Sequence, residues 1–125
     1  MKLSSFLAAK AIISLAFGLG FVVIPAVVWS IYGLTLDPAE IMMTRFFGAC
    51  LLGIGLICWF TRNADFKVLK GITLSLCIAD TIGFIIALTA QLSDIVNTLG
   101  WINVAIWLFL ALGLGYFRFL KPGTS

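Results

Sequence analysis

The stretch that decides the fold runs from Phe6 to Trp29 and reads FLAAKAIISLAFGLGFVVIPAVVW. It is apolar apart from Lys10 near its start, and about 20 apolar residues are enough to cross the roughly 30 Å hydrocarbon core of a bilayer. The run is too long for the core of a secretory signal peptide, and no small-residue cleavage site is evident before it. We therefore predict that this segment is a retained membrane helix.

Three further apolar segments follow the first. Of the 125 residues, 62% are hydrophobic and only 10% are charged, which excludes a water-soluble domain. Hydropathy predicts membrane helices at about residues 11–29, 41–60, 68–90 and 99–119, joined by short loops. The expected fold class is an all-α membrane protein, a four-helix bundle that forms a single domain over residues 1–125.

The positive charges predict the orientation of this bundle. Cytoplasmic loops of membrane proteins carry an excess of Lys and Arg. In this sequence the predicted first and third loops carry neither residue, and the basic side chains on the opposite side are Lys2, Lys10, Arg62, Lys67, Lys70, Arg118 and Lys121. We therefore expect the N-terminus and the C-terminus both to lie in the cytoplasm.

Two local signals refine the helix boundaries. Pro25 lacks a backbone N–H, so it predicts a bend late in the first helix. Residues Asp37 to Glu40 read DPAE, in which Asp37 suits the N-cap, Pro38 the first helical position and Glu40 the third. The sequence thus predicts a capping box and a sharp start to the second helix.

Arg45 and Asp80 are the two charged residues expected inside the spans, away from the helix ends. A charge at the bilayer centre costs about 2.5–3.5 kcal/mol on insertion scales, so each needs a partner. We expect these two side chains to pair, directly or through water. Such a pair either fixes the register of the helices or forms a site for an anionic headgroup, a proton or a substrate.

Four polar residues could extend a site around this pair or form ordinary interhelical hydrogen bonds: Thr44, Thr81, Gln91 and Asn103. The sequence contains no histidine, and its three cysteines have no metal-ligand spacing. It also lacks a Ser-His-Asp set, an HExxH motif and a phosphate-binding glycine loop. We therefore predict no catalytic residue, no metal site and no cofactor.

Small residues recur at every fourth position of the third segment, and such stripes let helices approach closely when lipid surrounds them. The predicted packing residues are Gly53 in the second segment and Gly71, Ser75, Ala79, Gly83 and Ala87 in the third. This pattern predicts that the third helix lies at the centre of the bundle. Contacts within the bundle and contacts with another subunit both explain the stripe.

Several short motifs carry a resemblance to known proteins. Residues 30–34 (SIYGL), 36–38 (LDP) and 45–49 (RFFGA), with LGW at residues 99–101 after Asn97, resemble a group of small bacterial four-helix membrane proteins of uncharacterised function. The resemblance implies a four-helix fold and a location in the bacterial inner membrane. It assigns no activity, and therefore no role, to Arg45 or Asp80.

Two functions are expected from these observations. The first is a non-catalytic accessory or assembly subunit of a larger membrane complex, whose partners would be the lipid bilayer and other membrane-protein subunits. The second is a transporter or binder of a small molecule, lipid or ion, built around Arg45 and Asp80. An enzyme would have only Asp80 to support it. The basic residues are scattered singly at the helix ends, so nucleic acid is not an expected partner.

Overall fold

The computed structural model describes residues 2–120 and consists of helices joined by short loops. The elements are α1 (Leu3–Val23), α2 (Pro25–Ile31), α3 (Pro38–Thr61), α4 (Phe66–Leu92), α5 (Gly100–Gly115) and η1 (Tyr116–Leu120), a π-helical continuation of α5. Four of them, α1, α3, α4 and α5 with η1, are long and apolar enough to cross a membrane. The prediction of four membrane-length helices is therefore confirmed.

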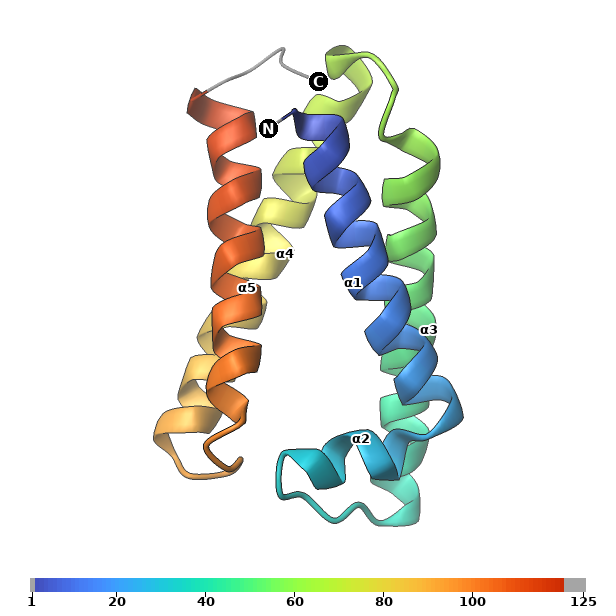
Figure 1. The fold of residues 1–125 in the computed structure, drawn as a ribbon, viewed down its shortest axis with the longest axis vertical. Helices are drawn as coiled ribbons and strands as arrows, with labels where there is room; N and C mark the ends of the chain where they lie inside the picture. The colour runs from blue at the N-terminus through green and yellow to red at the C-terminus, as the bar shows by residue number, and fades with distance from the viewer. Residues whose placement is uncertain (1, 121–125) are drawn as a thin grey trace.

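These helices form two antiparallel pairs, α1 with α3 and α4 with α5 (Figure 1). The pairs meet at the end of the molecule where α1 begins and η1 ends, and they diverge toward the opposite end. The short helix α2 lies across that wide end, roughly perpendicular to the long helices. The molecule is thus a wedge rather than a tightly packed four-helix bundle.

The apolar core lies at the narrow end of the wedge. Its buried residues come from both helix pairs: Leu3, Phe6, Leu7, Ala11, Cys58, Leu69, Leu110, Leu114 and Phe117. The Phe6 ring fills the space beside Gly113, where a Cβ atom would overlap it. Because the core ends about a turn beyond Lys10 on α1, little apolar packing holds the two pairs together beyond that level.

Glycines keep α1 close to α3 where α1 has left the core. A Cβ atom at Gly48 would lie 2.8 Å from the Gly18 carbonyl oxygen and 2.9 Å from Cβ of Phe21. In the other pair, the Trp107 ring of α5 lies directly against Gly83 of α4. Each pair therefore has its own close contact, and these contacts leave the space between the pairs open.

The first helix differs from its predicted bounds at both ends. It begins at Leu3 rather than residue 11, and it ends at Val23, where Ile24 adopts φ −133° and ψ 56°. Pro25 then starts the separate helix α2, because a proline suits the first helical position but cannot donate to the preceding turn. The expected bend at Pro25 is in fact a complete break.

The predicted capping box is present at the start of α3. The Glu40 backbone N–H donates to Asp37 Oδ1 at 2.8 Å, and the Asp37 backbone N–H donates to Glu40 Oε1 at 3.0 Å. Pro38 occupies the first helical turn, as expected. This segment is fixed by local sequence, which is why it could be predicted closely.

The small-residue stripe of α4 lies only partly inside the molecule. Gly83 and Ala87 do face the interior, but Gly71 and Ser75 are exposed and Ala79 borders an open cavity. A Cβ atom added at Gly53 of α3 or at Gly71 of α4 would have no neighbour within 4 Å. Since α4 packs mainly on α5, the expectation that this helix forms the centre of the bundle is wrong.

Candidate functional site

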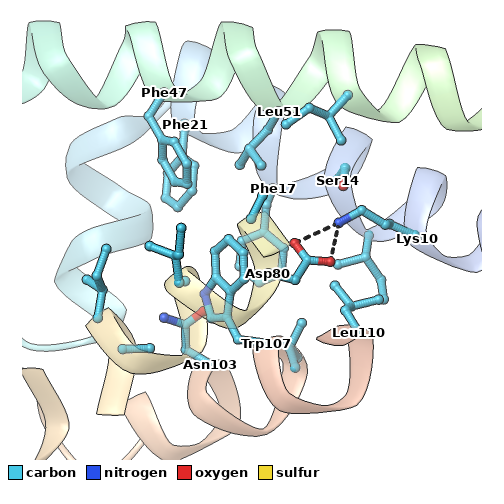
Figure 2. Close-up of a pocket in the computed structure, with 18 of the residues that line it drawn as sticks. Lys10, Ser14, Phe17, Phe21, Phe47, Leu51, Asp80, Asn103, Trp107 and Leu110 are labelled. Atoms are coloured by element: carbon cyan, nitrogen blue, oxygen red, sulfur yellow. Dashed lines mark hydrogen bonds and ion pairs between the residues drawn. The ribbon is translucent and has the colours of Figure 1, made fainter. Parts of the chain in front are cut away.

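A buried ion pair joins the two helix pairs. Lys10 Nζ of α1 donates to Asp80 Oδ2 at 2.8 Å and to Oδ1 at 3.0 Å, and both side chains are only 4% exposed (Figure 2). Lys10 lies seven residues into α1, and Asp80 lies near the middle of α4. The pair is therefore a polar link between the α1–α3 hairpin and the α4–α5 hairpin.

The expected pairing of Asp80 with Arg45 is wrong. Arg45 lies seven residues into α3 with an exposed side chain, and its Nε donates to the Val22 carbonyl oxygen at 3.2 Å. That carbonyl is available because α1 ends at Val23, so its last carbonyls lack intrahelical partners. Arg45 therefore provides a hydrogen-bond donor for the C-terminal end of α1, while Asp80 pairs with Lys10 in the N-terminal half of the same helix.

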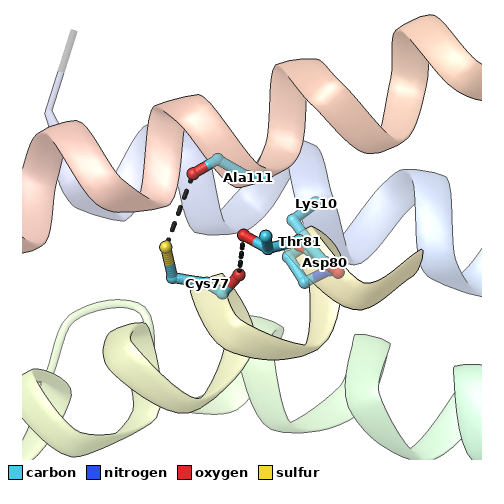
Figure 3. Close-up of polar contacts among 5 residues, drawn as sticks. All are labelled: Lys10, Cys77, Asp80, Thr81 and Ala111. Carbon is cyan, nitrogen blue, oxygen red and sulfur yellow. Dashed lines mark hydrogen bonds and ion pairs between the residues drawn. The ribbon is translucent and has the colours of Figure 1, made fainter. Parts of the chain in front are cut away.

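The α4 turn that carries Asp80 has two further polar contacts. Cys77 Sγ lies 3.6 Å from the Ala111 carbonyl oxygen of α5, and Thr81 Oγ1 donates to the Cys77 carbonyl oxygen at 2.8 Å (Figure 3). Thr81 is exposed, and its hydroxyl donates within its own helix rather than to the site. It does not extend the site as its sequence position suggested.

A cavity of about 500 Å³ begins at the ion pair and occupies the space between the hairpins (Figure 2). Lys10, Ser14 and Asp80 line its narrow end, and apolar side chains form most of the remaining wall. Its aromatic lining residues come from α1, α2, α3, α5 and the loop after α2: Phe17, Phe21, Trp29, Tyr32, Phe47 and Trp107. The cavity is thus an apolar space with a charged pair at one end.

The aromatic side chains form a connected wall. Phe21 stacks on Trp29 with ring centroids 5.3 Å apart and planes 15° apart, and it also contacts Phe47 at 5.5 Å. Figure 2 shows Phe21 and Phe47 on one side of the space and Trp107 with Asn103 on the other. Rings on both sides favour a flat, apolar occupant, since aromatic pairs prefer stacked or edge contacts.

The exposed side chains of the cavity lining all belong to α3 and α4, which indicates a lateral opening between these two helices. Among its lining residues, Phe47 is 40% exposed, Ile82 53% and Ile86 64%, and all three belong to these two helices. In a membrane such exposure is to lipid rather than to water. A lipid-soluble molecule could therefore enter from the bilayer without crossing an aqueous phase.

The wide end is held by hydrogen bonds between loops. Asn97, in the loop between α4 and α5, donates from Nδ2 to the Ile31 carbonyl oxygen and from its backbone N–H to the Tyr32 carbonyl oxygen, both at 2.9 Å. Gly33 turns the chain there with φ +84°, a conformation that suits glycine. Burial raises the pKa of the Tyr32 hydroxyl above its ordinary value.

The remaining predicted polar residues lie in three different places. Asn103 lines the cavity, as a site residue would. Gln91 is buried at the end of α4, where Nε2 donates to the Asn97 carbonyl oxygen at 3.1 Å. Thr44 borders a separate shallow hollow near α2. Of the predicted polar lining, only Asn103 thus joins Asp80 in the cavity wall.

Sequence reasoning missed Lys10, which it placed at the cytoplasmic surface. A signal for its burial was available: residues 3–9, LSSFLAA, carry no charge and extend the apolar run toward the N-terminus. Among residues 2–120, no group of three or more Cys, Asp or Glu side chains is placed to hold a metal ion. The site therefore offers one ammonium and one carboxylate within an apolar space.

Comparison with known proteins places the chain in a family. No curated protein and no solved structure matches it significantly. Residues 8–121 match the family described as a domain of unknown function (DUF8292), a range that includes the ion pair and the whole cavity lining. Because this match covers most of its length, the chain belongs to the DUF8292 family.

Proposed function

We propose that this protein binds a lipophilic small molecule within the membrane, in the cavity between its two hairpins. The observation that carries the proposal is the cavity itself, whose wall is mostly apolar and whose inner end is lined by a charged pair. Ligand pockets typically measure about 300–1,000 Å³ and combine apolar walls with a few placed polar groups. The space of about 500 Å³ suits a molecule of that size.

The lateral opening supports access from the lipid phase. Ile82 and Ile86 belong to the cavity lining although more than half of each side chain is exposed. A binding role also accounts for the charged pair, because ionisable groups inside membrane segments are costly and commonly mark functional sites. The proposed role is non-catalytic binding, with or without transport.

Fluorescence in lipid nanodiscs tests this proposal. Trp29 and Trp107 line the cavity, whereas Trp59 and Trp101 do not. The probe 1-methylpyrene accepts excitation energy from tryptophan, and saturable transfer is expected at low probe-to-lipid ratios. The substitution Ala79→Phe places a ring in the cavity wall and should weaken binding by about tenfold, as overpacking would.

Ala49→Phe is the matched control. Ala49 is also an exposed alanine of a long apolar helix, but it does not line the cavity. It should leave the affinity for 1-methylpyrene unchanged. Transfer that rises linearly with probe concentration, or that is identical in the two variants, would show partitioning into lipid and would contradict the proposal.

A second candidate, an accessory subunit of a membrane complex, is favoured by the open small-residue positions. Gly53 and Gly71 face empty space, where the helix of another protein could approach closely. The partner would then be another membrane-protein subunit. Co-purification after mild extraction from native membranes, lost in Gly71→Leu but kept in Ala49→Leu, would support this function; the absence of any crosslinked partner would count against it.

We further propose that the protein lies in the bacterial inner membrane with its narrow end toward the cytoplasm. Apart from the buried Lys10, the described basic residues on that side are Lys2, Arg62, Lys67, Lys70 and Arg118. Lys121, which the sequence places with them, lies outside the described residues. The loops of the wide end still contain no Lys or Arg, so the charge asymmetry supports this orientation. Single cysteines at Asn63 and at Thr98, in a cysteine-free background, should react with impermeant maleimide from opposite sides.

A further inference from the structure

The Lys10–Asp80 pair retains hydrogen-bonding capacity that faces the cavity. A lysine ammonium has three N–H donors, and the carboxylate accepts two of them. Each carboxylate oxygen can still accept a further hydrogen bond. Both residues line the cavity, so one donor and several acceptor positions lie within reach of an occupant.

The charge of this site is balanced. Lys10 and Asp80 neutralise each other at 2.8 Å, and no other Lys, Arg, Asp or Glu lines the cavity among the described residues. An anionic occupant would be attracted by Lys10 but repelled by Asp80, and a cationic occupant would meet the reverse. Neither would recover the solvation that it loses on entering an apolar space.

A hydroxyl group fits this arrangement better than either ion. It can accept from the third N–H of Lys10 while donating to an Asp80 oxygen, whereas a carboxylate can only accept and an ammonium can only donate. Hydrogen bonds to charged groups are also stronger than those between neutral groups. The inner end of the cavity is therefore matched to a neutral group that both donates and accepts.

The length and the aromatic lining of the cavity indicate the shape of the rest of the ligand. The lining follows α4 from Asp80 to Ala90, a distance of about 15 Å at 1.5 Å per residue. Aromatic rings border this length from both hairpins, with Phe17, Phe21 and Phe47 on one and Trp107 on the other. A planar ring system would contact both sides at once.

We propose that the cavity selects an uncharged amphiphile, a planar ring system that bears a hydroxyl group, and that the hydroxyl binds between Lys10 and Asp80. This inference rests on the proposed binding function and adds the class and the orientation of the ligand. The ring body lies between the aromatic walls and points toward α2. Entry is from the lipid, through the opening between α3 and α4.

Four pyrene probes with the same ring body test the choice of polar group. They are 1-pyrenemethanol, 1-pyrenecarboxylate, 1-pyrenemethylammonium and 1-methylpyrene, each titrated into the full chain in nanodiscs of zwitterionic lipid. Affinities are expressed per membrane-partitioned probe, so that differences in partitioning cancel. We expect 1-pyrenemethanol to bind about tenfold more tightly than each of the other three.

The variant Lys10→Met with Asp80→Leu assigns that preference to the pair. Both replacements are apolar and of similar length, and a buried ion pair can often be replaced in this way without loss of stability. The double variant should bind 1-pyrenemethanol and 1-methylpyrene equally. Ser14→Ala, which removes the other polar side chain at the narrow end, should keep the tenfold preference.

The outcomes separate this inference from the proposed function. Saturable binding of all four probes with equal affinity would overturn the hydroxyl preference and leave the binding function standing. Tighter binding of either charged probe, or loss of the preference in Ser14→Ala alone, would also overturn it. If no probe binds saturably, both the inference and the binding function fail. Should the double variant not fold, the ranking of the four probes in the unaltered protein decides the question.

Discussion

We predict that Lys10 of α1 and Asp80 of α4 are strongly coupled, so that their contributions to the free energy of unfolding are not additive. Both side chains are 4% exposed, and each loses its partner when the other is removed. Removing one member of a buried pair typically costs about 3–5 kcal/mol, because the remaining charge has no compensation. Two charge-assisted hydrogen bonds of about 1.5–3 kcal/mol each give a similar range.

The perturbation is a double-mutant cycle built from Lys10→Met and Asp80→Leu. Each single variant should unfold with a free energy about 3–5 kcal/mol below that of the unaltered protein. The double variant should come within about 2 kcal/mol of the unaltered protein, since no charge is then left unpaired. The unfolding free energy is measured by titration with sodium dodecyl sulfate in mixed micelles, followed by circular dichroism.

Arg45→Met supplies the control for this cycle. Arg45 donates to the Val22 carbonyl oxygen and does not contact Asp80, so Arg45→Met and Asp80→Leu should be additive within about 0.5 kcal/mol. A coupling of several kcal/mol between Arg45 and Asp80 would refute the assignment of partners. So would additivity between Lys10→Met and Asp80→Leu.

Three further predictions concern other parts of the fold. Gly48→Ala should lower the free energy of unfolding by about 1–3 kcal/mol, because its Cβ would meet α1 backbone at 2.8 Å; Gly53→Ala, which meets nothing within 4 Å, should be neutral or stabilising by up to about 1 kcal/mol. Asp37→Ala should cost about 1 kcal/mol by removing the N-cap of α3, measured in the same titration and contradicted by unchanged stability. Asn97→Ala should speed amide exchange in α2, because the bond to the Ile31 carbonyl is lost; equal exchange in Asn97→Ala and in the control Thr98→Ala would contradict this role.

Features that depend on a few neighbouring residues could be predicted from the sequence. The four apolar segments and the capping box at Asp37 are of this kind, and the structure contains both. Pro25 also predicted an irregularity correctly, although the helix ends there instead of bending. In each case the physical cause, burial of apolar length or satisfaction of a helix end, acts within one segment.

The partner of Asp80 could not be obtained in the same way. Lys10 and Asp80 are 70 residues apart, and their contact depends on where α4 crosses α1. The predicted first helix started just after Lys10, because an unpaired lysine is costly in a membrane. Once Asp80 compensates that cost, α1 can extend to Leu3 with Lys10 inside it.

The cavity was likewise beyond sequence reasoning, because it arises from the divergence of two hairpins. Close contacts at glycines occur within each pair: Gly18 and Gly48 between α1 and α3, and Gly83 between α4 and α5. Of these glycines, only Gly83 is among the predicted packing residues. Close packing inside the pairs does not require close packing between them. A stripe of small residues therefore indicates that helices approach, without identifying which helices do so.

Two polar junctions fix the width of the space between the hairpins. One is the Lys10–Asp80 pair at the narrow end, and the other is the contact of Asn97 with the Ile31 and Tyr32 carbonyls at the wide end. The apolar core lies at the narrow end alone, so it does not hold the hairpins apart or together along the cavity. A ligand between the junctions would contact both hairpins and replace the apolar packing that is missing there. Because such a ligand binds the folded state, it should also raise the stability of the protein in proportion to its affinity and concentration.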